Sequence, residues 1–146
     1  MDIKIEDLKY EDIEECYKLN MDIFNENRDL QEIKDLYKKY SGMKDTYRYL
    51  VAKVDGKIVG YTSCIIGYNL FDGKHPFMTL WYVGTHPDYR RKGVATKLFQ
   101  TVEEIARENH CELIYFTSEM YRKDAHAFYE KMGYDQNKSK AFIKYL

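Results

Sequence analysis

A cluster of basic residues lies in the middle of the sequence, between an extended aromatic segment and an amphipathic segment. Arg90, Arg91 and Lys92 supply three positive charges in a row. Gly93 follows directly, and the small residue Ala95 comes two positions later. Backbone N–H groups at the start of a helix lack intrahelical acceptors, and the helix dipole favours negative charge there. The pattern therefore predicts an anion-binding turn, and the alternative is an ordinary strand-to-helix turn with a solvated basic cluster.

A second candidate for chemistry lies near the end of the sequence. Tyr129 carries an apolar ring and a polar hydroxyl group. Phe128 and Tyr129 have helical spacing with Ala125 and Met132, and Gly133 follows them. Apolar residues at that spacing form the buried face of a helix, so spacing alone favours a core tyrosine.

Hydrophobic periodicity places the basic cluster between a strand and a helix. The run from Phe77 to Thr85 is rich in aromatic and β-branched residues, which favour an extended strand. Val94 and later apolar residues at helical spacing predict a helix that ends near Asn109. The cluster thus occupies the turn that joins the two elements.

The remaining segments predict a mixed sheet covered by helices. Asp55-Gly56 is a strong two-residue hairpin signal between two of the strands. The predicted order is β-α-α-β-β-β-α-β-α-β, an α/β (α+β) fold with six to seven strands, about four helices and a single domain over residues 1–146. We expect strands at 2–6, 47–54, 57–68, 77–85, 113–117 and 141–146, and helices at 11–25, 30–40, 94–109 and around 125–132.

Composition narrows the function classes. The chain has 146 residues and a formal net charge of −1, which argues against a general nucleic-acid binder. Its 3 cysteines and 4 histidines show no metal-ligand spacing, so we expect no metal and reduced thiols in a cytoplasmic protein. No signal-peptide core and no apolar run of about 18 residues is present, so we expect no membrane association.

Two motifs, taken together, resemble the GNAT superfamily of N-acetyltransferases. The first is Arg-x-x-Gly-x-Ala over residues 90–95, preceded by Pro-Asp-Tyr. The second is the segment 124–134, which contains Phe-Tyr-Glu-Lys and ends in Gly-Tyr, like the superfamily's C-terminal signature. The resemblance covers essentially the whole chain. It implies an enzyme that uses acetyl-CoA as cosubstrate and acetylates a primary amine by direct attack.

The resemblance also implies which residues hold the cosubstrate. Main-chain amides of the turn would cradle the pyrophosphate, and the backbone around Val83 and Thr85 would pair with the pantetheine arm. Arg122 stands where the family often has an asparagine, and an arginine there would meet a phosphate or an acidic substrate group. The residues of the turn are Arg90 at the Gln/Arg position, Arg91, Lys92, Gly93, Val94, Ala95 and Thr96.

The reaction needs an acid, a polarising donor and a base. The resemblance implies that Tyr129 protonates the leaving thiolate, and we expect the main-chain N–H of Val83 to polarise the thioester carbonyl. For the base, Glu119 and Glu26 are candidates, and a water chain that ends at a backbone carbonyl is the alternative.

Other functions stay open at this point. A non-catalytic acyl-CoA-binding or regulatory module could use the same fold, and it would lack acetyl transfer. The acceptor is a small-molecule or peptide amine, and the segments expected to contact it, Asn25–Asp29 and Asp135–Lys140, carry both signs of charge. We allow for a homodimer, and no feature of the sequence sets the oligomeric state.

Overall fold

A computed structural model describes all 146 residues of the chain. The chain divides into two compact units, an N-terminal unit from Met1 to Tyr115 and a C-terminal unit from Phe116 to Leu146. The N-terminal unit contains the sheet and most of the helices. None of the helices combines the length and the apolar character that a membrane span requires.

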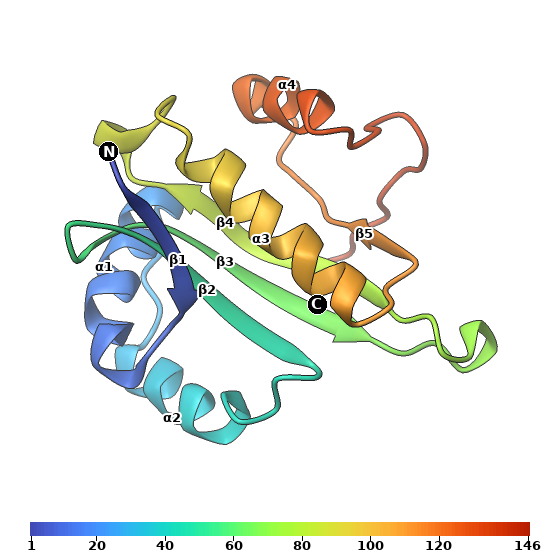
Figure 1. The fold of residues 1–146 in the computed structure, drawn as a ribbon, viewed down its shortest axis with the longest axis horizontal. Helices are drawn as coiled ribbons and strands as arrows, with labels where there is room; N and C mark the ends of the chain where they lie inside the picture. Colours follow the sequence, from blue (N-terminus) through green and yellow to red (C-terminus); the bar gives the residue numbers. More distant parts are fainter. The chain divides into compact units, whose positions relative to one another are not determined.

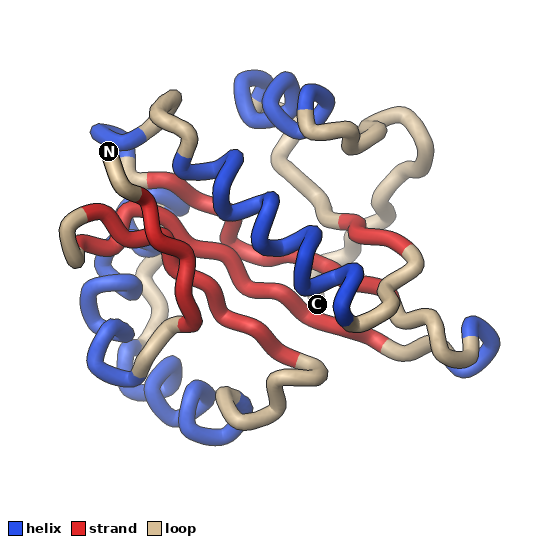
Figure 2. The backbone as a smooth tube through the Cα atoms, viewed as in Figure 1, coloured by secondary structure: helices blue, strands red, loops and turns tan.

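The N-terminal unit is built on a five-stranded mixed sheet with strand order β1-β2-β3-β4-β5 (Figures 1 and 2). The first four strands pair antiparallel, and β5 pairs parallel to β4. The turn Asp55-Gly56 joins β2 to β3, and both residues have positive φ angles, as a type I′ hairpin turn requires. The strands are β1 (Ile3–Asp7), β2 (Tyr47–Val54), β3 (Lys57–Gly67), β4 (Phe77–Thr85) and β5 (Leu113–Tyr115).

Helices cover both faces of this sheet. Val94 of α3 packs with Ala52 and Val59, whereas Cys16 of α1 packs with Val51 on the other face. Adjacent residues of β2 are therefore both fully buried, because successive side chains point to opposite faces. The helices are α1 (Ile13–Phe24), α2 (Leu30–Tyr40) and α3 (Val94–Glu108), with short 3₁₀ turns at Tyr10–Asp12, Leu70–Asp72 and Pro87–Tyr89.

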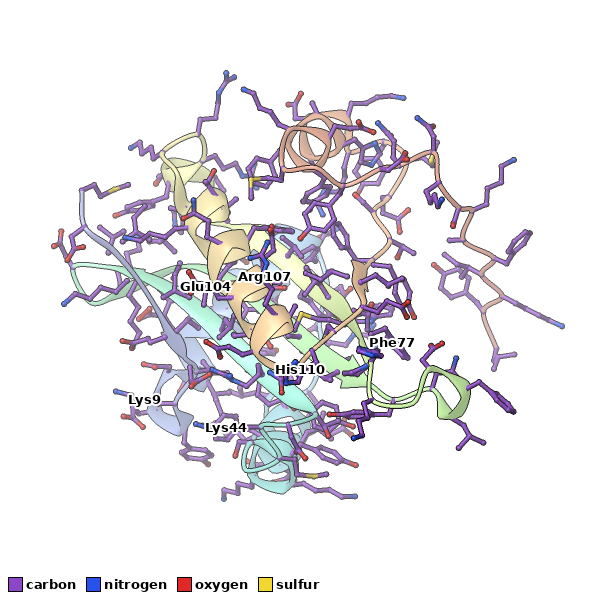
Figure 3. The ribbon with its side chains drawn as sticks, turned by 45° about the vertical axis from the view of Figure 1, so that its right-hand side comes forward. Lys9, Lys44, Phe77, Glu104, Arg107 and His110 are labelled. Atoms are coloured by element: carbon purple, nitrogen blue, oxygen red, sulfur yellow. The ribbon has the colours of Figure 1, made fainter.

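The amphipathic character of α3 is visible in the direction of its side chains. Figure 3 shows Glu104 and Arg107 on this helix, and both side chains are exposed. Leu98, Phe99 and Val102, in contrast, are fully buried. This arrangement fixes the axis of α3 against the sheet and so fixes the position of its N-terminus.

The C-terminal unit contains one helix, α4 (Lys123–Lys131), and an aromatic cluster. The ring of Phe116 lies 4.8 Å from the ring of Tyr129 and 5.3 Å from that of Tyr134. Gly133 follows the C-cap of α4 with a φ of +96°, the left-handed conformation in which a glycine commonly ends a helix.

The expected number of strands is wrong, because the sheet has five strands and not six to seven. Residues 141–146 form no strand, and Phe142 and Tyr145 are 95% and 87% exposed. Alternating apolar residues suit a strand, but a strand also needs a neighbouring backbone to complete its hydrogen bonds. The segment 141–146 pairs with no other strand, so the alternation produces no regular structure. The strand expected at 113–117 is also shorter, since β5 ends at Tyr115.

Candidate functional site

The connection between β4 and α3 forms an open helix N-terminus. Gly93 is the N-cap of α3, has a φ of +88° and provides no side-chain cap. The first helical hydrogen bond runs from Lys97 N to Gly93 O. The N–H groups of the three preceding positions therefore have no intrahelical acceptor. These three residues are Val94, Ala95 and Thr96.

The backbone at Gly93 faces open space. A Cβ built on Gly93 would meet no atom within 4 Å, so the backbone is accessible to a ligand. Val94 is buried against the sheet and anchors the first turn of α3. An anion can therefore reach the free N–H groups and the positive end of the helix dipole without any side chain moving.

The three basic side chains of the turn have different surroundings. Arg90 donates from Nε to the carbonyl oxygen of Thr85 at 3.3 Å, which ties the turn to the end of β4. Lys92 places its Nζ 5.6 Å from the centre of the Tyr89 ring. Arg91 has a φ of +61° and is exposed. Of the three, Arg91 is the charge most available to a ligand in solution.

One edge of β4 lacks a neighbouring strand over most of its length. β5 pairs only with residues 77–79 of β4. The N–H of His86 donates to Val59 O of β3 at 2.8 Å. Because successive N–H groups of an extended strand point to opposite sides, the N–H groups of Thr85 and Val83 point away from β3. An extended ligand can pair with this edge as an added strand would.

A bulge interrupts β4 beside Val83. The register between β3 and β4 shifts near Thr62, and Tyr82 has a φ of +59°, which is rare for a residue with a side chain. The Tyr82 hydroxyl donates to Oε2 of Glu26 at 2.6 Å, and its ring packs edge-on against Phe24 at 5.0 Å. The bulge therefore connects β4 to the loop between α1 and α2.

Glu26 receives two hydrogen bonds through the same oxygen. Arg28 Nε donates to Oε2 at 3.0 Å, in addition to the bond from Tyr82. These bonds hold the pKa of Glu26 below its ordinary range, with the larger effect from Tyr82. Burial and the neighbouring carboxylate raise the pKa of Tyr82. Glu26 is thus ionised at neutral pH, and its basicity is weak.

The other candidate site residues belong to the C-terminal unit. Burial raises the pKa of Tyr129, which is only 9% exposed, so its hydroxyl is protonated at neutral pH. Arg122 is half-buried, and its positive charge opposes the effect of burial by lowering the pKa of Tyr129. Glu119 is exposed, and its carbonyl oxygen accepts from Arg122 N at 3.0 Å.

The structure thus brings Glu26, Val83 and the 90–96 turn into the N-terminal unit and Tyr129, Glu119 and Arg122 into the C-terminal one. Sequence reasoning missed Tyr82 and Arg28 as partners of Glu26. Arg28 lies two residues after Glu26, so their opposite charges were a local signal for this pair. No local pattern could have found Tyr82, because the bulge arises from the register of β3 against β4. No group of three or more His, Cys, Asp or Glu side chains is arranged to hold a metal ion.

Comparison with known proteins identifies the family to which the chain belongs. The family model described as the acetyltransferase (GNAT) family matches residues 13–134. The chain belongs to the GNAT acetyltransferase family. Its resemblance to that family, proposed from the two sequence motifs, is therefore confirmed.

Relatives of this GNAT protein occur among curated proteins and solved structures. An acetyltransferase of Pectobacterium atrosepticum is 36% identical over 90 residues, which cover 60% of this chain and 57% of the relative. The chain thus matches less than two thirds of that relative's length. A glucosamine-6-phosphate N-acetyltransferase from Arabidopsis thaliana has the same fold, with a TM-score of 0.84, 19% identity and 99% of each chain covered.

A transcriptional regulator from Bacillus halodurans is equally similar in fold. Its TM-score is 0.84 at 22% identity, and the match covers 99% of this chain and 100% of that one. The GNAT fold therefore occurs in solved proteins whose descriptions differ. Function has to be argued from the site and not from the fold alone.

Proposed function

We propose that this chain is an N-acetyltransferase that transfers the acetyl group of acetyl-CoA to a primary amine. The observation that carries the proposal is the open N-terminus of α3 beside the unpaired edge of β4. The family membership supports the same cosubstrate. The turn offers N–H groups and positive charge to a pyrophosphate, and the strand edge offers N–H and C=O groups to the amides of pantetheine.

Different residues of the N-terminal unit would bind different parts of the cosubstrate. The amides of residues 91–96 would bind the pyrophosphate, and Arg91 would add positive charge near the nucleotide. The backbone of Val83 and Thr85 would pair with the pantetheine arm. This pairing would bring the thioester to the bulge of β4, and the N–H of Val83 would stabilise negative charge on its carbonyl oxygen. From the C-terminal unit, Arg122 would bind a phosphate or an acidic group of the substrate.

The proposed reaction is a direct attack. The acceptor ammonium group first loses one proton to solvent. The neutral amine nitrogen then forms a bond to the carbonyl carbon, and the bond between that carbon and sulfur breaks. Tyr129 would donate its proton to the departing thiolate and recover it from water. The proton of the attacking amine would pass to Glu119, Glu26 or a water chain. The lowered pKa of Glu26 makes this carboxylate a weak proton acceptor.

An assay of free thiol release with acetyl-CoA and a panel of primary amines tests this proposal. Amine-dependent thiol release, with one acetylated amine formed for each thiol, supports it. Calorimetric binding of acetyl-CoA in the absence of any amine-dependent release favours the alternative, a non-catalytic acyl-CoA-binding or regulatory module. Absence of binding would contradict both functions.

A further inference from the structure

The loop between α1 and α2 holds a pair of opposite charges against the bulge of β4. Glu26 and Arg28 form an ion pair at 3.0 Å, and Tyr82 attaches this pair to the strand. The backbone of the loop is fixed as well. Tyr17 donates its hydroxyl to Arg28 O at 2.6 Å, and Arg28 N donates to the sulfur of Met21 at 3.3 Å.

The position of the pair relates it to the proposed reaction. Tyr82 precedes Val83, whose N–H points to the unpaired edge of β4. The side chain of Tyr82, however, packs against Phe24 of α1. A cosubstrate that arrives along the strand edge and an acceptor that approaches from the α1–α2 loop would therefore meet at the bulge. A strained residue such as Tyr82 is retained only when its surroundings fix it, and such residues cluster at binding sites.

The ion pair leaves hydrogen-bonding capacity unused on both Glu26 and Arg28. Both donors from the protein use Oε2 of Glu26, so Oε1 can still accept a hydrogen bond. The side chain of Arg28 is 65% exposed and donates to Glu26 only through Nε. A negative acceptor atom and a positive donor group thus lie side by side and open to a ligand.

We propose that this pair binds the amine acceptor and that the acceptor is a zwitterion, a free α-amino acid with its ammonium group at Glu26 and its carboxylate at Arg28. The inference rests on the N-acetyltransferase function proposed above. An α-amino acid carries its two charges on adjacent groups, as the protein pair does. Such a ligand leaves neither Glu26 nor Arg28 without a partner.

Other classes of amine fit this pair less well. A polyamine brings positive charge only, and Arg28 already neutralises Glu26. A polyamine bound at Glu26 would take this carboxylate from Arg28, or the positive charge of Arg28 would repel the polyamine. A phosphorylated amino sugar brings about −1.5 to −2 charges against a single guanidinium, whereas a carboxylate brings one. The charge balance therefore favours the amino acid.

Initial rates of thiol release test the inference. Each of the common L-amino acids is compared with its methyl ester, which keeps the amine and lacks the carboxylate, and with spermidine and glucosamine 6-phosphate. We expect at least one amino acid to exceed its ester in kcat/KM by about 10- to 100-fold, as for the loss of a charged hydrogen bond. Spermidine, the phosphorylated sugar or the esters acting as well as the amino acids would overturn the inference.

Substitutions in the loop between α1 and α2 test whether the preference for the amino acid over its ester depends on Glu26 and Arg28. Arg28→Gln should reduce the preference for acid over ester and raise KM for the amino acid, with KM for acetyl-CoA unchanged. Glu26→Gln keeps an acceptor for Tyr82 and should raise KM for the amino acid. The matched control Lys18→Gln removes an exposed cation of α1 that pairs with Glu14 at 3.7 Å, and it should change neither preference. An unchanged ratio of acid to ester in Arg28→Gln would contradict the inference.

Binding without turnover separates this inference from the proposed function. The carboxyl carbon of Glu26 is followed by NMR while the same amino acids are added to the full chain. A shift that Arg28→Gln abolishes supports the zwitterion site, even if no acetyl transfer is found and the enzymatic proposal fails. Acetyl transfer to another amine, with no shift from any amino acid, would overturn the inference and leave the proposed function standing.

Discussion

Tyr129 is the single residue on which the proposed proton transfer depends. Its ring packs 5.7 Å from that of Phe128 and 4.8 Å from that of Phe116. Burial raises the pKa of its hydroxyl above the ordinary value of 10.0. The protonated form needed of an acid is therefore fully present at neutral pH and is lost as pH rises through this raised pKa. The raised pKa thus keeps the hydroxyl protonated, as a proton donor requires.

Replacing Tyr129 with phenylalanine should separate this role from packing. The ring stays, so we expect the fold and the affinity for acetyl-CoA to change little. The kcat should fall by about 10²–10⁴-fold if proton transfer limits the rate, and any loss of activity with rising pH that depends on this phenol should disappear. Steady-state kinetics from pH 6 to 11 measure both effects. A weaker affinity with unchanged kcat would instead make Tyr129 a binding residue.

A substitution at Gly93 tests the proposed pyrophosphate site. In Gly93→Val, a side chain enters the open space above the turn, at a φ of +88° that costs of the order of 1–2 kcal/mol. We expect CoA affinity measured by calorimetry to fall together with a modest loss of stability. Gly73→Val is the matched control, because Gly73 also has a positive φ of +63° and open space around its Cβ. The control should lose stability but bind CoA normally, and equal affinity in the two variants would remove Gly93 from the site.

At the scale of elements, the turn before α3 combines three charges with unequal freedom. All three side chains are exposed, but Arg90 donates to the end of β4 and Lys92 lies over the ring of Tyr89, whereas Arg91 makes neither kind of contact. Exposed charges are screened over about 8–10 Å at ordinary ionic strength. The contribution of Arg91 to ligand binding should therefore be the most sensitive to salt.

We expect CoA to bind more weakly as salt increases, and dephospho-CoA to bind more weakly than CoA at low salt. Arg91→Gln should remove more of this salt dependence than Arg90→Gln, because the Arg90 side chain holds the turn to Thr85. Calorimetry between 50 and 500 mM salt provides the comparison. If salt has no effect and both ligands bind equally, the basic cluster lies outside the nucleotide site.

Sequence patterns could predict most elements but not all of their pairing. The boundaries of β2 and β4 and the N-terminus of α3 follow from local periodicity and from Gly93, and the structure confirms them. The bulge at Tyr82 and its bond to Glu26 depend on how β3 and β4 align, and no local pattern contains that information. The prediction of a strand at 141–146 was wrong for a related reason. Alternating apolar residues indicate which side of a strand would be buried, but they do not specify the strand with which it would pair.

At the scale of the whole molecule, three free thiols report on how tightly the chain is packed. Cys16 and Cys64 are 3% and 0% exposed, and burial raises the pKa of each to about 12. Cys111, which follows α3, is only partly buried. Thiolate is the reactive form, so the two buried cysteines should be nearly inert in the folded protein.

A disulfide reagent at pH 8 should titrate one thiol in the folded protein and three in denaturant. The fast thiol should be lost in Cys111→Ser, which identifies it. The other two should react at a rate that follows global unfolding, since both lie in the core of the N-terminal unit. Reaction of all three thiols at one rate without denaturant would show that the core opens far more readily than its packing implies.

The unpaired edge of β4 has a consequence for amide hydrogen exchange. The N–H of His86 is held by β3, whereas those of Val83 and Thr85 have no strand opposite them. Within one strand, neighbouring amides should therefore exchange with deuterium at alternating slow and fast rates. A ligand that pairs with the edge would slow only the fast amides. Exchange followed residue by residue would then reveal where an unknown ligand lies along β4, before any reaction has been found for the protein.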